Sequence, residues 1–571
     1  MSPLPADDER FPPGTVRLID LDGNVEGRHA DGSSEKDVVL HPMPSEDPED
    51  PLNWSFKRKL LATSCVIMYT LMVAIPSSIV YSVVTPIQEA TSLVLDDLNL
   101  GTGVMFLCYG WACILWQPLA LQYGKRPTYL VSMAANIVSV MLTDCLRPLL
   151  NIEQAILASA PWCTVRSTYL ANRCLQGFFG SPVESLCEIS ITDIWFAHER
   201  PKYLGWYGFT LSLTGKLAPM LSGFINYGQD WRWSLWWCAI WIGISFVYCF
   251  FLMEETNFDR PPRHSQESSP STSSHSLQPD SDVVDAEKHT EKQHPKTETT
   301  PTQVLDVEPG QTIYPRKSYW QKLSLLDKKR PNRMLDIFLA PFRGFTYPAV
   351  VYAGFMYGAN NLVWTGIQNA TTGTVYKSFY GWSTLDIAAA YSAGIIGAII
   401  GGYACGKLGR VLTMKLARRN GGISESEHTL YMFIIPTILA PFSLFLYGLG
   451  VTYNIHWFGL VFSQGCLAVV SALSVAGALG YAISSYPELS GDMVTTCILI
   501  RNTLSFAINY GITPWVNNMG YRDTFIMAGC IAFAWNASFA VFIQYGRKLR
   551  ESSAERYYGH VEAARAKGLN H

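Results

Sequence analysis

Long apolar stretches alternate with short polar ones along most of the chain. A bilayer core about 30 Å thick needs about 20 mainly apolar residues for each helix that crosses it. The pattern therefore predicts twelve spanning helices. They cover residues 59–82, 100–123, 128–146, 168–195, 203–227, 234–253, 345–368, 384–406, 429–450, 455–484, 491–514 and 522–545.

Two stretches are too polar to be buried. Residues 1–56 are acidic and Pro-rich, which predicts a disordered cytosolic tail. Residues 257–343 include a long Ser/Thr/Pro/charge segment, which predicts a largely disordered cytosolic linker. The predicted domains are thus an N-terminal six-helix bundle at 57–256, a C-terminal six-helix bundle at 344–546 and a cytosolic C-terminal tail at 547–571.

Composition supports an integral membrane protein. The 571 residues are 49% hydrophobic and 16% charged, whereas soluble chains carry about 25% charged residues. A formal charge of −3 argues against a nucleic-acid partner, and the 13 cysteines form no CxxC pair or metal spacing. The sequence contains no P-loop, HExxH, nucleophile elbow or dinucleotide fingerprint, so we expect no metal, no cofactor and no enzymatic activity.

Basic residues favour one side of the predicted membrane. Fifteen Lys and Arg lie in or beside alternate short connections, against five on the opposite side. The positive-inside rule then places both termini and the linker in the cytosol. The sequon at Asn369 falls just after the seventh predicted helix, on the outer side, and is a candidate glycosylation site.

The two halves of the chain echo each other. QYGKRPTYL (122–130) follows the second helix of the first half, and GGYACGKLGRVL (401–412) ends the second helix of the second half. We interpret both as cytosolic turns of a parallel six-helix repeat, which favours a site between two bundles. The alternative is that each is a plain positive-inside loop. The candidate gating residues here are Gly124, Lys125, Arg126, Gly406, Lys407, Gly409 and Arg410.

Several short motifs fall beside or within the predicted helices of the first half. They are YGKRP (123–127), NRCLQGFFG (172–180), GKLAPMLSG (215–223), DWRWSLWW (230–237) and FLMEETNFDR (251–260). Together they resemble the major facilitator superfamily, specifically the fungal twelve-helix drug:proton antiporter branch. The last motif is most similar to a subgroup that includes yeast polyamine and histidinol transporters. The resemblance implies an all-α membrane protein with twelve transmembrane helices in two six-helix bundles around a central cavity.

The motifs depart from the family pattern at a few positions. Leu121 and Gln122 stand where the first-half loop motif normally carries Asp and Arg. Lys216 stands in the fifth helix where an uncharged residue is usual. These departures affect the expected gating contacts and leave the expected fold unchanged.

Charged side chains interrupt the apolar fourth helix, among them Arg173, Glu184 and Glu188. A charge at the bilayer centre costs at least about 2.5–3.5 kcal/mol, so these groups must face the bundle interior or a wet cavity. On one continuous helix, Arg173 and Glu184 are eleven positions apart and lie within about 20° of the same face. The resemblance places this helix beside the central cavity.

We therefore predict that Glu184 binds a proton or a cationic substrate, and that Arg173 couples its protonation to movement of the bundles. Lys216 on the fifth helix and Arg501 on the eleventh are candidate counter-charges. The alternative is a structural pair between Glu184 and Lys216. Glu188 is the weaker candidate, with a structural role as its alternative.

Other candidates are polar or aromatic side chains on helices that should face the cavity. Aromatic walls with a few amides suit an amphipathic molecule or an organic cation. The alternative is interfacial aromatics and interhelical amide hydrogen bonds. Asp193 and Arg200, in the loop after the fourth helix, are a candidate gating clasp. The cavity candidates are Tyr69, Gln176, Tyr357, Asn360, Asn361, Trp364, Gln464 and Asn502.

The sequence thus predicts a monomeric, proton-coupled secondary active transporter in the plasma membrane. Its partners are protons, the lipid bilayer and a small-molecule substrate. The favoured task is export of a small organic molecule, such as a drug or a fungal secondary metabolite. The alternatives are proton-coupled uptake of an organic cation such as a polyamine, and a non-transporting nutrient sensor.

Overall fold

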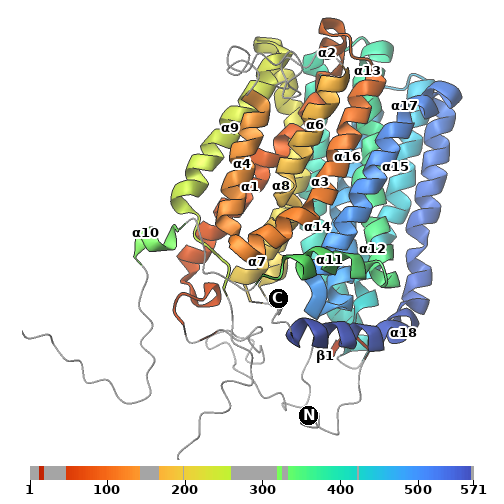
Figure 1. The fold of residues 1–571 in the computed structure, drawn as a ribbon. Helices are drawn as coiled ribbons and strands as arrows, with labels where there is room; N and C mark the ends of the chain where they lie inside the picture. The colour runs from red at the N-terminus through yellow and green to blue at the C-terminus, as the bar shows by residue number, and fades with distance from the viewer. Residues whose placement is uncertain are drawn as a thin grey trace, which may run out of the picture.

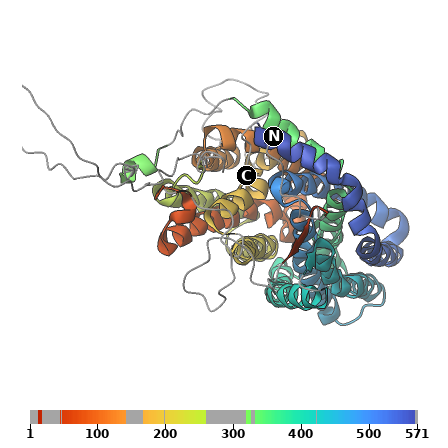
Figure 2. The same cartoon turned by 90° about the horizontal axis from the view of Figure 1, so that it is seen from below.

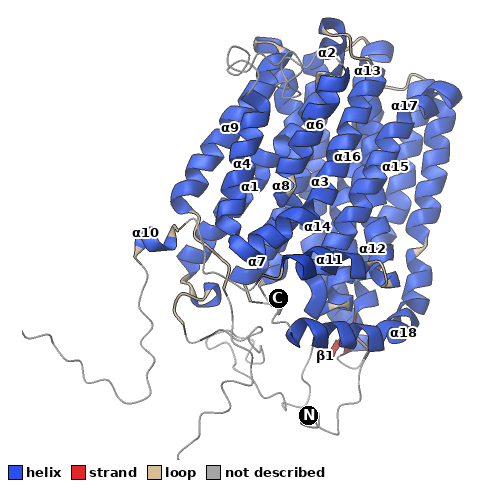
Figure 3. Ribbon diagram, viewed as in Figure 1, coloured by secondary structure: helices blue, strands red, loops and turns tan. Residues whose placement is uncertain are grey.

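A computed structural model describes residues 12–17, 45, 47–141, 166–196, 199–258, 318–324, 332–420 and 423–566. Long helices run roughly side by side and make up nearly all of it (Figures 1 and 3). Seen along the helices, the part up to residue 258 lies on one side and the part from residue 332 on the other (Figure 2). We call these parts the N-terminal half and the C-terminal half.

The N-terminal half contains six long helical segments, two of which are interrupted or extended by a turn. After the short helix η1 (Pro51–Asn53), its elements are α1 (Phe56–Ser78), the 3₁₀ turn η2 (Ile79–Ser82), α2 (Val84–Ala90), α3 (Leu95–Tyr123), α4 (Lys125–Met141), α6 (Arg166–Gly180), α7 (Pro182–Ile194), α8 (Arg200–Gly228) and α9 (Trp231–Leu252).

The C-terminal half repeats this plan after two short helices. The first of these, α10 (Tyr319–Lys322), precedes the C-terminal half and bonds to Phe251 of the N-terminal half. The elements of the C-terminal half are α11 (Met334–Gly344), α12 (Pro348–Gly358), the π-helical turn η5 (Ala359–Val363), α13 (Trp364–Tyr380), α14 (Thr384–Arg419), η6 (Ser426–Phe433), α15 (Ile434–Thr452), α16 (Trp457–Ser485), η7 (Pro487–Leu489), α17 (Ser490–Ala537) and α18 (Phe539–Ala566). The backbone of α17 leaves the helical conformation at Gly520 (φ 74°), so 490–519 and 521–537 are two helices in space.

All twelve predicted spanning segments contain helix in the described residues. Seven helical stretches are long and apolar enough to cross a membrane: Phe56–Ser82, Leu95–Tyr123, Trp231–Leu252, Thr384–Arg419, Ser426–Thr452, Trp457–Ser485 and Pro487–Ala564. The last of these contains both the eleventh and the twelfth predicted helices. The fourth and seventh predicted segments are each broken into shorter helices, so neither forms one long apolar helix.

Two predictions about local structure are wrong. The fourth segment is not continuous, because α6 ends at Gly180 and α7 starts at Pro182, whose missing N–H suits the first position of a new helix. Arg173 and Glu184 therefore lie on two successive helices and not on one. The stretch 401–412 lies inside the continuous helix α14, because Gly costs a helix interior only about 1 kcal/mol.

Parts of the predicted tails and linker form regular secondary structure. Thr15–Arg17 forms the strand β1, which pairs antiparallel with β2 (Ile423–Glu425). Helix α11 lies in the predicted linker, and α18 runs through the predicted C-terminal tail; both cross the lower end of the bundles (Figure 1). Within 1–56 and 257–343, the structure describes residues 12–17, 45, 47–56, 257–258, 318–324 and 332–343, and the segment 142–165 lies outside the described residues.

Small residues bring the two halves into close contact. A Cβ atom added at Gly110 of α3 would lie 2.6 Å from Asn502 Cβ of α17, and one at Gly223 of α8 would lie 2.2 Å from Ala388 Cβ of α14. Small residues let membrane helices approach closely enough to gain van der Waals contact. The interface between the halves is therefore built along α3–α17 and α8–α14.

A buried ion pair fixes α18 beneath the C-terminal half. Arg550 Nη2 lies 2.5 Å from Glu427 Oε2 of η6, and both side chains are buried. Arg550 Nη1 also donates to the Pro13 carbonyl, at 2.5 Å. One guanidinium thus joins α18, η6 and the segment that leads into β1.

We predict that Arg550→Ala lowers the free energy of unfolding by about 3–5 kcal/mol, because it leaves the Glu427 carboxylate buried without a counter-ion. Arg547→Ala is the matched control, since Arg547 is exposed and pairs with Glu425 and Glu551 at the surface. The control should change stability by less than about 1 kcal/mol. Unfolding in mixed detergent micelles measures both, and equal effects would contradict the assignment.

Candidate functional site

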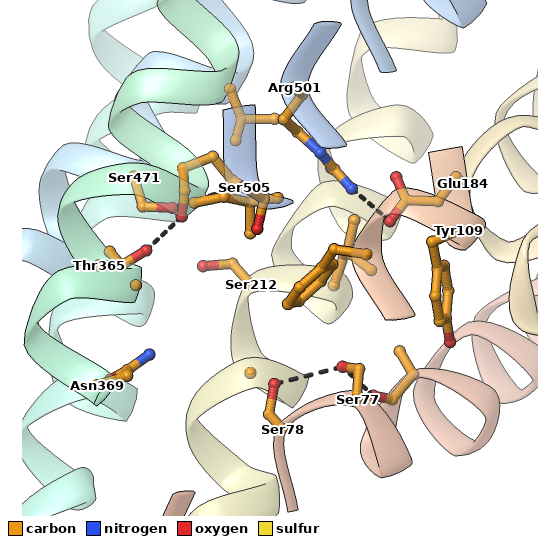
Figure 4. A pocket seen from close by; sticks show the side chains of 18 of the residues that line it. Ser77, Ser78, Tyr109, Glu184, Ser212, Thr365, Asn369, Ser471, Arg501 and Ser505 are labelled. Atoms are coloured by element: carbon orange, nitrogen blue, oxygen red, sulfur yellow. Dashed lines mark hydrogen bonds and ion pairs between the residues drawn. The ribbon is translucent and has the colours of Figure 1, made fainter. Parts of the chain in front are cut away.

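A cavity of about 100 Å³ lies between the two halves. Both halves contribute to its wall, through α1, α3, α7 and α8 on one side and η5, α13, α16 and α17 on the other. Its polar wall is rich in hydroxyl and amide groups (Figure 4). The polar and aromatic lining residues are Ser77, Ser78, Tyr81, Phe106, Tyr109, Glu184, Ser212, Lys216, Asn361, Thr365, Asn369, Ser471, Arg501, Ser505 and Asn509.

An ion pair that joins the halves lies in the cavity wall. Arg501 Nη2 of α17 contacts Glu184 Oε1 of α7 (Figure 4). The two residues are 2% and 4% exposed. Arg501 is also held within its own half, where Nη1 donates to Tyr357 Oη at 2.5 Å and Nη2 to Asn502 Oδ1 at 3.3 Å. The guanidinium is therefore fixed in the C-terminal half and meets a carboxylate of the N-terminal half.

Local sequence explains how Glu184 reaches this place. Pro182 starts α7, so Glu184 lies in the first turn of that helix. The positive end of the helix dipole favours a carboxylate there. The break between α6 and α7, which the sequence pattern did not reveal, therefore positions the carboxylate.

The ion pair leaves hydrogen-bonding capacity unused. Glu184 Oε2 and Arg501 Nε are buried and have no hydrogen-bond partner among the residues that the structure describes. Glu188 follows one turn later on α7, is 8% exposed, and makes no hydrogen bond or ion pair with the residues that the structure describes. Two carboxylates thus lie near one guanidinium, and one of them has no counter-ion of its own.

Arg173 is held by hydrogen bonds within the N-terminal half. Its Nη1 donates to the Pro76 carbonyl of α1 at 3.2 Å and to Gln176 Oε1 at 2.9 Å, and its Nε donates to Tyr169 Oη at 3.1 Å. Neither Arg173 nor Gln176 lines the cavity. Arg173 therefore ties α6 to α1 inside the N-terminal half.

Lys216 lines the cavity on α8 and is 7% exposed. It does not pair with Glu184, whose partner is Arg501. Tyr207, on the same helix, donates to the Val183 carbonyl at the start of α7, at 2.8 Å. Lys216 is nine residues farther along α8, so its Cα lies about 13 Å along the helix axis from the level of Tyr207.

Four other predicted cavity residues belong to the packed interior. Tyr69 bonds Ser132 Oγ at 2.7 Å within the N-terminal half. Asn360 exchanges hydrogen bonds with Asn536, at 2.8 and 3.0 Å. Trp364 is buried in the core of the C-terminal half, and Gln464 is buried with neither amide atom hydrogen-bonded. The alternative of interhelical amide bonding is thus confirmed for Asn360.

Asn361 does line the cavity, where it donates to Ser471 Oγ at 2.9 Å. Tyr357 and Asn502 do not line the cavity themselves. Each accepts a hydrogen bond from Arg501, which does line it. Sequence reasoning missed the serines, although a signal was present: Arg501, Ser505 and Asn509 are spaced by four and share one face of α17.

Asn369 requires a correction. It lies inside α13 rather than after the seventh helix, lines the cavity and is 9% exposed (Figure 4). Glycosylation attaches to surface asparagines, and this position is enclosed by both halves. The structure therefore gives Asn369 a place in the cavity wall instead.

The first predicted gating turn is a tight junction between helices. Gly124 has φ +118°, a conformation that favours glycine. Lys125 Nζ forms an ion pair with Asp193, and Glu255 accepts the Lys125 and Arg126 N–H groups at 3.1 and 3.0 Å. This turn is thus fastened within the N-terminal half.

The remaining predicted gating residues do not form a second turn of this kind. Arg200 Nε donates to the Trp195 carbonyl at 3.0 Å. Gly406 and Lys407 are exposed on α14. Gly409, on the same helix, faces Met432 of η6. The side chain of Arg410 lies outside the described residues. The second stretch is therefore a basic helix surface and not a turn equivalent to the first.

The fold and the polar cavity between two halves define a multi-pass membrane transporter. A family model described as Major Facilitator Superfamily matches residues 63–508, and the chain belongs to that superfamily. Its role is transport, not enzymatic catalysis.

Fungal transporters are among its similar proteins. An uncharacterized MFS-type transporter of Schizosaccharomyces pombe is 26% identical over 96% of this chain and 94% of its own length. Protein HOL1 of Saccharomyces cerevisiae is 25% identical over 90% of both chains. MFS transporter cpaT of Aspergillus oryzae is 22% identical over 89% of this chain and 90% of its own.

Proposed function

We propose that this protein exports a small organic molecule in exchange for protons, in the plasma membrane and with both termini in the cytosol. The observation that carries the proposal is the buried ion pair between Glu184 of the N-terminal half and Arg501 of the C-terminal half. A proton on Glu184 cancels the attraction across the interface. Protonation therefore acts directly on the contact that holds the halves together.

The size of the effect suits a two-state transporter. Removing one partner of a buried ion pair costs about 3–5 kcal/mol. Since each 1.4 kcal/mol is a tenfold change, this shifts the balance between two access states by a factor between about 10² and about 4 × 10³. Arg501 stays bonded to Tyr357 and Asn502 when the pair opens, so the cation is retained while the carboxylate moves away.

Glu188 supplies a second proton-binding group on the same helix. It is four residues from Glu184, so the two carboxylates lie on one face of α7. Its lack of a partner among the described residues leaves it free to take up or pass on a proton. The pair Glu184–Glu188 therefore forms the proton path in this proposal.

Proton-coupled uptake of an organic cation such as a polyamine is the second candidate. It is favoured by the excess of carboxylates over cations where Glu184, Glu188 and Arg501 meet. A cationic substrate at that place would be attracted by Glu188.

Direction can be tested in a yeast strain that lacks its own transporters of this kind. We expect expression of the protein to lower the intracellular amount of at least one compound from a panel of fungal growth inhibitors. Intracellular concentrations are measured by mass spectrometry, with spermidine in the same panel. A rise in spermidine with no decrease in any other compound would contradict export and support the second candidate.

Coupling can be tested with Glu184→Gln, which keeps the shape of the side chain and removes its titration. We expect this variant to lose nearly all proton-driven flux of the compound identified in yeast, while it folds and reaches the membrane. A pH-sensitive dye inside proteoliposomes should report alkalinisation when substrate enters by exchange, and no change for the variant.

The matched control is Glu89→Gln. Glu89 pairs with Lys377 across the same two halves, but both side chains are exposed, so this pair contributes little. The control should transport normally. Unimpaired proton-coupled flux in Glu184→Gln would return Glu184 to a purely structural role.

A further inference from the structure

Lys216 is a buried cation whose ammonium donors have no acceptor among the described residues. Among the described residues, it makes no ion pair and no hydrogen bond, although an ammonium group has three donors. Glu184 and Arg501, the other charged residues of the cavity wall, pair with each other. Lys216 is therefore the unbalanced charge of the wall that the structure describes.

Burial without a partner is costly. Taking an ammonium group out of water costs several kcal/mol unless an opposite charge and hydrogen bonds compensate. The hydrophobic alternatives of similar length, such as Met, would avoid this cost. A bound anion would supply the counter-charge that Lys216 lacks among the described residues.

The packing around Lys216 holds its stem in place. A Cβ atom added at Gly394 of α14 would lie 3.0 Å from Lys216 Cδ and 3.1 Å from Cγ. The absence of a side chain at Gly394 therefore makes room for the lysine stem at the interface between the halves.

The nearby lining offers hydrogen-bond donors and no second carboxylate. Ser212 lies one turn before Lys216 on α8 and faces the cavity (Figure 4). Ser78 lies 3.9 Å from the position of a Cβ at the neighbouring Gly215. Hydroxyl groups beside an ammonium form a set of donors that suits an oxyanion.

We propose that Lys216 binds an oxyanion of the transported molecule, so that the substrate is a small organic acid bound through its carboxylate. This rests on the proposed function, because it takes the cavity to be the transport site. A cavity of about 100 Å³ is smaller than the roughly 300 Å³ of typical drug sites, which favours a small acid. The Lys216 site and the Glu184–Arg501 pair lie at different levels along α8, so substrate and proton occupy separate sites.

The test uses matched acids and amides on the purified full-length protein. Benzoate and benzamide, nicotinate and nicotinamide, and inorganic phosphate are each titrated to 10 mM, roughly the range for weak transport substrates, and binding is followed as the shift in Tm. We expect at least one carboxylate, but not its amide, to raise the Tm. Lys216→Met should weaken that binding at least about tenfold, and Lys216→Arg should retain part of it.

Lys415→Met is the matched control, because Lys415 is exposed on α14 and lies outside the cavity wall. It should bind the carboxylate as the wild type does. Equal shifts with acid and amide, no carboxylate shift in the wild type, or undiminished binding in Lys216→Met would each overturn the proposal. A shift with phosphate alone would replace the organic acid by a phosphorylated substrate and overturn the carboxylate assignment.

Glu184→Gln separates this inference from the proposed function. We expect Glu184→Gln to lose proton coupling, and we expect Lys216→Met to lose carboxylate binding. Carboxylate binding without any loss of coupling would reject the coupling role of Glu184 and leave Lys216 as the anion site. Loss of coupling without carboxylate binding in the wild type would reject the Lys216 proposal alone.

Discussion

A charge inside a hydrocarbon-length helix must be paired or must face water, and this constraint organises the interior of the protein. Arg501 satisfies it with a carboxylate from the other half of the chain, so the interface between the halves contains a bond that one proton can break. Arg173 satisfies it inside one half, through carbonyl and hydroxyl oxygens. Arg501 thus bonds across the interface between the halves, whereas Arg173 bonds within the N-terminal half.

The rest of the interface is suited to movement. Small residues at Gly110 and Gly223 let the halves approach closely without interlocking large side chains. The turn at Gly124 is tied by Lys125, Asp193 and Glu255 within the N-terminal half, which keeps that half rigid. In the proposed mechanism, close contacts between small residues and one ion pair across the interface allow the halves to move relative to each other.

Much of the fold could be predicted from the sequence, because a bilayer imposes a length and a polarity on each helix. The twelve segments and the importance of Glu184 and Arg501 follow from that physical rule. The partners of each charge do not follow from it, since they depend on how segments far apart in the chain meet. Lys216 and Arg501 were equally plausible partners of Glu184, and only the packing of α7 against α17 decides between them.

Local breaks were the other source of error. Pro182 interrupts the fourth segment and η5 interrupts the seventh, whereas the glycines of 401–412 interrupt nothing. Gly and Pro mark places where a helix is able to end, and the tertiary packing determines whether it does. The same limit explains Asn369: the seventh helix continues beyond its apolar part, so a sequon that seemed to lie outside it lines the cavity.

The central claim is that protonation of Glu184 controls the contact between the halves. Spin labels at Val94 and Met519, which are exposed on opposite halves, can report the separation between them in a background with Cys530 replaced. Double electron–electron resonance spectroscopy should show a distribution of spin–spin distances that changes with pH in the wild type and does not change with pH in Glu184→Gln. A distribution that does not respond to pH in the wild type, or that responds identically in Glu184→Gln, would contradict the account.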